Sequence, residues 1–138
     1  MKRVIFDAGP LVAWFCPRDE HYAWVSLAFS QIPPGGIICE AVLAEVCYLA
    51  AKAGVERGRV IEFIEDGGLQ MVSLGAELRA IRGLLDRCAD IPMDFADACV
   101  VRLAELHPDA TVCTTDGHFQ FYRKLQRENI PLRAPFAG

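Results

Sequence analysis

The sequence predicts an α/β protein whose mostly parallel β-sheet is covered by helices on both faces. Short runs of β-branched and aromatic residues alternate along the chain with longer segments of helical spacing. Glycine and proline pairs separate several of these segments. Strands that alternate with helices in this way are typical of parallel sheets, which bury both of their faces.

The first predicted unit is a strand, a turn and a helix. The run Val4-Ile5-Phe6 has the residues of a buried strand and stops at Asp7. Gly9-Pro10 then opens a helix through Phe15, with proline in its favoured first turn. This arrangement leaves Asp7 between the strand and the helix.

The middle of the chain repeats this alternation. Residues 18–32 have helical spacing and end at the loop 33–36. Residues 36–39 predict a second strand, and residues 41–52 predict a helix that is apolar on nearly every side and therefore buried. A helix over 55–66, a strand over 69–72 and a helix over 77–88 follow.

The last third supplies two further strands. Asp94 is placed to cap a helix that runs to His107-Pro108. Residues 110–113 form the next predicted strand, which ends just before Asp116. A short helix is expected around residues 119–126 and a final strand near 130–132.

Length and composition predict a single domain over residues 1–138. A chain of 138 residues buries roughly two thirds of its unfolded surface. Hydrophobic residues make up 53% and charged residues 23%, which fits a folded domain without a disordered tail. The net charge of −4 argues against a protein that coats nucleic acid nonspecifically. It does not exclude an enzyme on nucleic acid, because bound metal ions offset clustered acids.

The sequence also indicates a cytoplasmic protein with no membrane segment. The basic start resembles an export signal, but Asp7 and Gly9-Pro10 interrupt the apolar run that follows. No stretch reaches the roughly eighteen apolar residues of a membrane helix. The six cysteines contain no C-x-x-C pair, so neither a zinc site nor a dithiol motif is indicated. Reduced thiols are expected, with three disulfides as the alternative.

Two aspartates each follow a short predicted strand and precede a turn with glycine. Asp7 and Asp116 therefore stand at the carboxyl ends of strands, where open α/β sheets bind ligands. Each taken alone has an ordinary explanation as a turn or helix-cap residue. Their agreement favours a shared site.

Glu45 is the third candidate acid. It lies in the middle of an apolar helix, between Ala44 and Val46, and a buried charge needs a partner. A distant Arg or Lys, or a position at the helix edge, would also explain it. A bound cation satisfies it more directly.

Asp97 and Asp94 lie three residues apart at the start of one helix. Both could belong to a capping pair that the helix dipole favours. Because one acid is enough for a cap, we interpret Asp94 as the cap and Asp97 as a ligand. Oxygen ligands of this kind suit Mg²⁺ or Mn²⁺. The isolated histidines, His21, His107 and His118, do not form a competing site.

Four segments of the chain resemble the PIN-domain nucleases, and among them the VapC-type toxins of bacterial toxin–antitoxin pairs. The resemblance covers the whole chain in order and is carried by the segments 4–13, 40–45, 94–98 and 114–116. It implies a mostly parallel five-stranded sheet in a PIN-like three-layer sandwich.

The same resemblance implies an activity and its residues. The acidic quartet would be Asp7, Glu45, Asp97 and Asp116, with Asp7, Asp97 and Asp116 as ligands of Mg²⁺ or Mn²⁺. Thr115 matches a hydroxyl position that supports the site, whereas His118 departs from the residues that many relatives have there. The implied activity is metal-dependent hydrolysis of RNA. The implied partners are a cognate antitoxin and a second copy in a homodimer.

Basic residues after the last acid are candidate RNA contacts. Arg123, Lys124 and Arg127 fall on the predicted short helix, where they could steer a phosphate backbone toward the acids. An ordinary solvated basic face is the alternative.

Three other functions remain to be weighed. A phosphotransfer receiver domain needs paired acids after its first strand and a late lysine, and this chain has Asp7 alone and no lysine next to Asp116. A PIN-like binding module without catalysis usually lacks one of the acids. An RNA-processing nuclease without an antitoxin has the same site and stays open.

Overall fold

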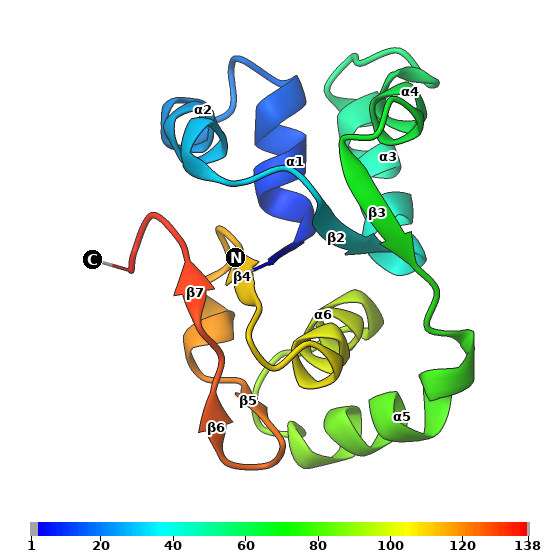
Figure 1. Cartoon of the computed structure of the whole chain (residues 1–138), viewed down its shortest axis with the longest axis vertical. Helices are drawn as coiled ribbons and strands as arrows, with labels where there is room; N and C mark the ends of the chain where they lie inside the picture. The colour runs from blue at the N-terminus through cyan, green and yellow to red at the C-terminus, as the bar shows by residue number, and fades with distance from the viewer. Residues whose placement is uncertain (1–2, 138) are drawn as a thin grey trace.

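The computed structural model describes residues 3–137, and a five-stranded parallel sheet forms its centre (Figure 1). The strand order is β3-β2-β1-β4-β7, and all four neighbouring pairs are parallel. The predicted parallel sheet is therefore confirmed. Its strands are β1 (Val4–Phe6), β2 (Gly36–Cys39), β3 (Leu69–Val72), β4 (Thr111–Cys113) and β7 (Leu132–Arg133).

Helices cover both faces of this sheet. In Figure 1, α1, α2 and α4 lie on one side of the strands and α5 and α6 on the other. Helix α3 contacts both α1 and α6 and so joins the two layers. The helices are α1 (Ala8–Phe15), α2 (Tyr22–Gln31), α3 (Glu40–Lys52), α4 (Arg59–Glu65), α5 (Leu78–Arg87) and α6 (Phe95–Leu106), with 3₁₀ turns η1 (Gly75–Glu77) and η2 (Gly117–Gln120).

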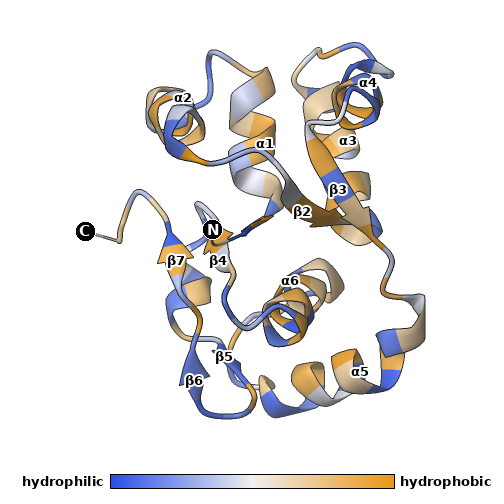
Figure 2. Ribbon diagram, viewed as in Figure 1, coloured by the Kyte–Doolittle hydropathy of each residue, from blue (hydrophilic) through white to orange (hydrophobic). Residues whose placement is uncertain are grey.

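The inner strands form the hydrophobic core. Ile5, Ile37, Ile38 and Val112 are fully buried, and β2 is mostly orange, the hydrophobic end of the scale, in Figure 2. Continuous apolar runs of this kind are expected in a sheet with two covered faces. Burial of each such side chain contributes roughly 1.5–3 kcal/mol.

The register of β1 and β4 determines which residues lie side by side where the chain leaves the sheet. Phe6 of β1 pairs with Cys113 of β4, and the Asp7 amide donates to the Cys113 carbonyl at 3.0 Å. Residues Asp7 and Thr114 consequently leave neighbouring strands at the same edge. This edge carries the candidate site.

Three helices begin later than their sequence patterns predict. Helix α2 begins at Tyr22 rather than at residue 18, and the Asp19 carboxylate accepts the His21 amide at 2.8 Å in the turn before it. Helix α4 begins at Arg59 rather than at residue 55, and a 3₁₀ turn precedes α5. Local turns thus replace the first turn of each predicted helix.

The prediction that the helix over 41–52 is buried holds for one side of α3 only, where Val42, Val46 and Ala50 are buried. The structure places Ala44, Tyr48 and Lys52 of α3 on an exposed face, and Tyr48 is 64% exposed. The Lys52 ammonium lies 5.4 Å from the centre of the Tyr48 ring. Alanine and tyrosine count as apolar in a pattern, yet both tolerate a solvent-facing position.

The predicted helix over 119–126 is wrong. After η2, the chain forms an antiparallel pair of short strands, β5 (Arg123–Lys124) and β6 (Glu128–Asn129). Leu125 and Gln126 between them have φ values of 49° and 72°, which an α-helix does not contain. The three candidate basic residues therefore lie on a hairpin.

The structure also describes the state of the cysteines and the apolar character of the helices. All six cysteines are free thiols, and Cys39, Cys99 and Cys113 are buried. Within residues 3–137 no helix combines the length and the apolar character that a membrane crossing requires.

Candidate active site

Asp7 stands at the junction of β1 and α1 and is only 6% exposed. It occupies the position before the first helical residue, but its side chain makes no capping hydrogen bond. The carboxylate instead accepts a hydrogen bond from the Thr114 hydroxyl at 2.7 Å. The cap explanation of Asp7 is therefore not supported.

Thr114 is a site residue that the sequence pattern missed. It is fully buried, donates its hydroxyl to Asp7 and accepts the Asp116 amide at 2.9 Å. The signal for it was the register: residues that directly follow two paired strands lie side by side. The hydroxyl thereby fixes Asp7 and the backbone of Asp116 together.

Thr115, the predicted supporting residue, has a different contact. A Cβ atom at Gly9 would lie 2.1 Å from the Thr115 hydroxyl oxygen. Glycine at this position of α1 therefore permits Thr115 to approach the start of the helix. The hydroxyl bonded to the buried aspartate belongs to Thr114.

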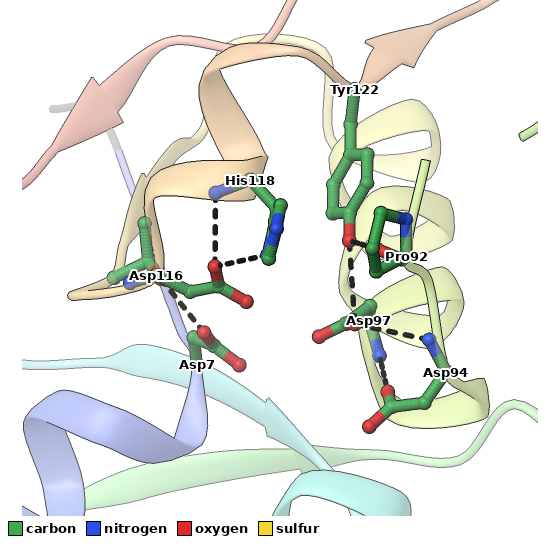
Figure 3. A network of polar contacts seen from close by, with 8 residues as sticks. Asp7, Pro92, Asp94, Asp97, Asp116, His118 and Tyr122 are labelled. Atoms are coloured by element: carbon green, nitrogen blue, oxygen red, sulfur yellow. Dashed lines mark hydrogen bonds and ion pairs between the residues drawn. The ribbon is translucent and has the colours of Figure 1, made fainter. Parts of the chain in front are cut away.

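Asp116 precedes η2 and is held by His118. One carboxylate oxygen of Asp116 accepts the His118 amide at 2.9 Å and also lies 2.9 Å from the His118 Nδ1. The capping role expected of a turn aspartate is thus present here. His118 faces the candidate site through this pair (Figure 3).

Asp94 and Asp97 form a reciprocal capping box at the start of α6. The Asp97 amide donates to Asp94 at 2.8 Å, and the Asp94 amide donates to Asp97 Oδ2 at 3.0 Å. Asp94 is the predicted cap. Asp97 shares the capping role through one oxygen, and in Figure 3 its carboxylate is directed toward Asp7 and Asp116.

The Tyr122 hydroxyl contacts Asp97. The tyrosine is fully buried, donates its hydroxyl to the Pro92 carbonyl and lies 3.4 Å from Asp97 Oδ2. Burial and the negative charge of Asp97 raise the pKa of Tyr122. Tyr122 is a second residue that the sequence pattern did not identify, because its contacts lie 25 and 30 residues away in the chain.

Glu45 of α3 lies near enough to the other acids for their charges to act on it. Burial raises the pKa of Glu45, and the charges of Asp94, Asp97 and Asp116 raise it further. No lysine or arginine within residues 3–137 forms an ion pair with Glu45. The alternative of a distant basic partner is not supported for this residue.

Burial raises the pKa values of these acids, and their charges raise them further. Burial raises the pKa of Asp7 to about 6; the Thr114 hydrogen bond opposes this shift, and the charges of Glu45 and Asp116 add to it. Burial likewise raises the pKa of Asp97 to about 7, with contributions from the charges of Asp94, Asp7 and Asp116. The structure therefore brings all four predicted acids together.

The donor set fits a hard divalent cation. The candidate ligands are carboxylate oxygens, and among residues 3–137 only His118 forms an ion pair with any of the four acids. In the same part of the chain, no three His, Cys, Asp or Glu side chains are close enough to enclose an ion by themselves. Mg²⁺ keeps several water ligands and needs only one or two carboxylates, so this open arrangement suits Mg²⁺ or Mn²⁺ better than a closed cage.

Comparisons with known proteins agree with this fold. The PIN domain family model matches residues 4–125. The chain belongs to the PIN domain family. Ribonuclease VapC26 of Mycobacterium tuberculosis is 27% identical over 126 residues, which cover 88% of this chain and 93% of that protein.

A solved structure shows the same fold. Mycobacterium tuberculosis VapC20, described as a sarcin-ricin loop cleaving toxin, superposes with a TM-score of 0.80 over 91% of this chain and 98% of the other. Its sequence identity is 16%, so the likeness concerns the fold alone. The resemblance to VapC-type PIN-domain proteins and the PIN-like three-layer architecture are both confirmed.

Proposed function

We propose that this chain is a Mg²⁺- or Mn²⁺-dependent endoribonuclease of the VapC type. One observation carries the proposal: Asp7, Glu45, Asp97 and Asp116 converge from four separate elements without a lysine or arginine partner in the described chain. Mutual repulsion of this kind costs stability unless a cation offsets it. The PIN domain match and the relation to ribonuclease VapC26 support the same assignment.

The residues have distinct roles in the proposal. Asp7, Asp97 and Asp116 would hold the ion together with water ligands, and Glu45 would be the fourth acid of the site. A bound ion would supply Lewis-acid chemistry for phosphodiester hydrolysis, namely polarisation of a phosphoryl oxygen and activation of a water. Thr114 holds Asp7, His118 holds Asp116, and the capping box with Tyr122 holds Asp97.

The three basic residues proposed as RNA contacts differ in their exposure and in their hydrogen bonds. Lys124 is buried and donates its ammonium to the Pro108 carbonyl at 2.9 Å, so it is omitted from the RNA surface. Arg123 donates to the carbonyls of Gln120 and Tyr122. The exposed Arg127 stays a candidate contact.

The biological setting is also part of the proposal. The relatives' names favour a ribonuclease toxin, and a cognate antitoxin, a homodimer and a cytoplasmic location are the further expectations that the resemblance implies. An RNA-processing nuclease without an antitoxin would carry the same site, and a small DNA-binding protein encoded immediately upstream would favour the toxin. A PIN-like binding module without catalysis is disfavoured because all four acids are present.

A cleavage assay on single-stranded RNA tests the activity. Wild-type protein should cleave with Mg²⁺ or Mn²⁺ and stop when a chelator is added. Asp7→Asn should reduce cleavage by at least a hundredfold with an unchanged circular dichroism spectrum, whereas Asp66→Asn, an exposed acid outside the site, should cleave normally. Metal-dependent cleavage retained by Asp7→Asn would refute the assignment.

A further inference from the structure

A cavity of about 370 Å³ lies between α5, α6 and the turn of the β5–β6 hairpin. Its walls include Arg79 and Arg87 of α5, Arg102 and Glu105 of α6, and Gln126 of the turn. In Figure 1 the end of α5 approaches the hairpin just below α6. Nothing in the proposed chemistry of the four acids uses these residues.

The charges around this cavity are not balanced. Arg102 pairs with both nearby glutamates, Glu77 at 2.7 Å and Glu105 at 3.0 Å. Within residues 3–137, neither Arg79 nor Arg87 forms an ion pair, and both are exposed. Two free guanidinium groups therefore border the cavity while its carboxylates are already engaged.

The hairpin wall of the cavity is fixed to α6. The second oxygen of Glu105 accepts the Leu125 amide at 2.7 Å, and the buried Lys124 donates to the Pro108 carbonyl just after α6. These two contacts hold the turn at Leu125 and Gln126, where the backbone is left-handed. On the opposite wall Gly83 leaves free space beside Arg87, whose Nη1 atom would lie 3.4 Å from a Cβ at that position.

Helix α6 connects the acids to the cavity. Asp97 and Arg102 are five residues apart on α6, which corresponds to about 7.5 Å along the helix axis and to a turn of about 140° around it. A strand of RNA that crosses the acids at the start of α6 and continues around this helix would reach Arg79 and Arg87. Guanidinium groups bind phosphate oxygens through paired hydrogen bonds.

We propose that this cavity binds a backbone phosphate of the RNA strand, a few nucleotides from the bond that is cleaved, through Arg79 and Arg87. The inference rests on the proposed ribonuclease function and adds a substrate contact to it. The Gln126 side chain supplies a further polar group at the same cavity. The site predicts tighter binding of RNA strands long enough to span both the acids and the cavity.

Binding of single-stranded RNA tests the proposal. The affinity of a labelled twenty-nucleotide RNA is measured by fluorescence anisotropy across a salt series, in the inactive Asp7→Asn background. Arg79→Gln with Arg87→Gln should weaken binding at least tenfold and reduce the slope of log affinity against log salt by about 0.7, because the one phosphate contact that is lost contributes about 0.7 for a single strand. The matched control is Arg18→Gln with Arg57→Gln, two exposed arginines outside the cavity, and it should change neither quantity. A trinucleotide, too short to reach the cavity, should bind both double variants equally.

The outcomes separate this site from the ribonuclease proposal. If the Arg79 and Arg87 double variant matches the control in affinity and slope while the wild-type protein cleaves RNA, the phosphate site is refuted and the ribonuclease stands. If the cavity variant loses RNA affinity but the wild-type protein never cleaves, the phosphate site stands and catalysis falls. If polyglutamate binds these arginines more tightly than RNA does, the cavity belongs to an acidic protein segment and the RNA assignment is overturned.

Discussion

At the scale of single residues, hydroxyl groups and backbone amides control where the acids point. The Thr114 hydroxyl holds Asp7 at 2.7 Å, and this hydrogen bond opposes the rise in the Asp7 pKa that burial causes. His118 and Asp94 perform the corresponding task for Asp116 and Asp97. A ligand set this closely spaced needs such fixation, because free side chains would turn away from one another.

Thr114→Val should move the activity toward higher pH. Without its hydroxyl donor the pKa of Asp7 rises further, so the acidic limb of the cleavage profile should shift upward by about one pH unit. Thr114→Ser keeps the donor and should restore the wild-type profile. Identical profiles for the valine and serine variants would show that the hydroxyl does not act on Asp7.

At the scale of elements, four separate segments each deliver one acid. The β1–α1 junction supplies Asp7, α3 supplies Glu45, the start of α6 supplies Asp97, and the segment after β4 supplies Asp116. The close approach of α1 to the segment after β4 depends on the missing side chain at Gly9. Site geometry is therefore a property of how these elements pack.

Gly9→Ala tests this packing. Alanine favours a helix over glycine by roughly 0.5–1 kcal/mol, but its Cβ would lie 2.1 Å from the Thr115 hydroxyl oxygen. We expect a net loss of about 1–3 kcal/mol in the free energy of unfolding, measured by urea denaturation. The loss should shrink in a Thr115→Ala background; a Gly9→Ala protein more stable than wild type would contradict the contact.

At the scale of the whole molecule, the parallel topology gathers acids from distant parts of the chain at one edge of the sheet. Strand β1 lies in the middle of the sheet, between β2 and β4, so the residues after β1 and β4 meet there. The concentrated negative charge destabilises the metal-free fold. An ion bound at this edge stabilises the folded state, since the unfolded chain has no such site.

The metal-free protein should therefore lose stability as the pH rises. The pKa values of Asp7, about 6, and Asp97, about 7, lie above the values near 4 of unfolded aspartate. The folded state binds more protons between about pH 4 and pH 7, so the stabilising contribution of protonated Asp7 and Asp97 is lost through that window. Thermal unfolding in chelator should show Tm falling from pH 5 to pH 8 more steeply than in Asp7→Asn with Asp97→Asn. Equal slopes would contradict the raised pKa values.

Local patterns in the sequence were enough to predict much of the fold and the residues of the acidic group. Asp7 and Asp116 could be predicted because Asp7 directly follows β1 and Asp116 lies three residues after the end of β4, and the strand order brings strand ends together. The Asp94 cap could be predicted because a capping box is a contact between residues three apart. Glu45 stood out as an acid within an apolar segment.

Other features could not be predicted because they depend on distant contacts. Lys124 is buried because the Pro108 carbonyl, sixteen residues earlier, accepts its ammonium. The exposed face of α3 escaped notice because a hydrophobicity pattern gives Ala44 and Tyr48 the same weight as core residues. The difference between Thr114 and Thr115 required the register between β1 and β4.

Direct titration with Mn²⁺, followed by electron paramagnetic resonance of the free ion at pH 7.5, measures the central claim without relying on cleavage. The wild-type chain should take up the ion, and single replacement of Asp7, Asp97 or Asp116 by Asn should weaken the uptake at least tenfold while Asp66→Asn leaves it unchanged. Uptake that survives all three replacements, or that is absent from the folded wild-type protein, would contradict a cation held by the converging acids.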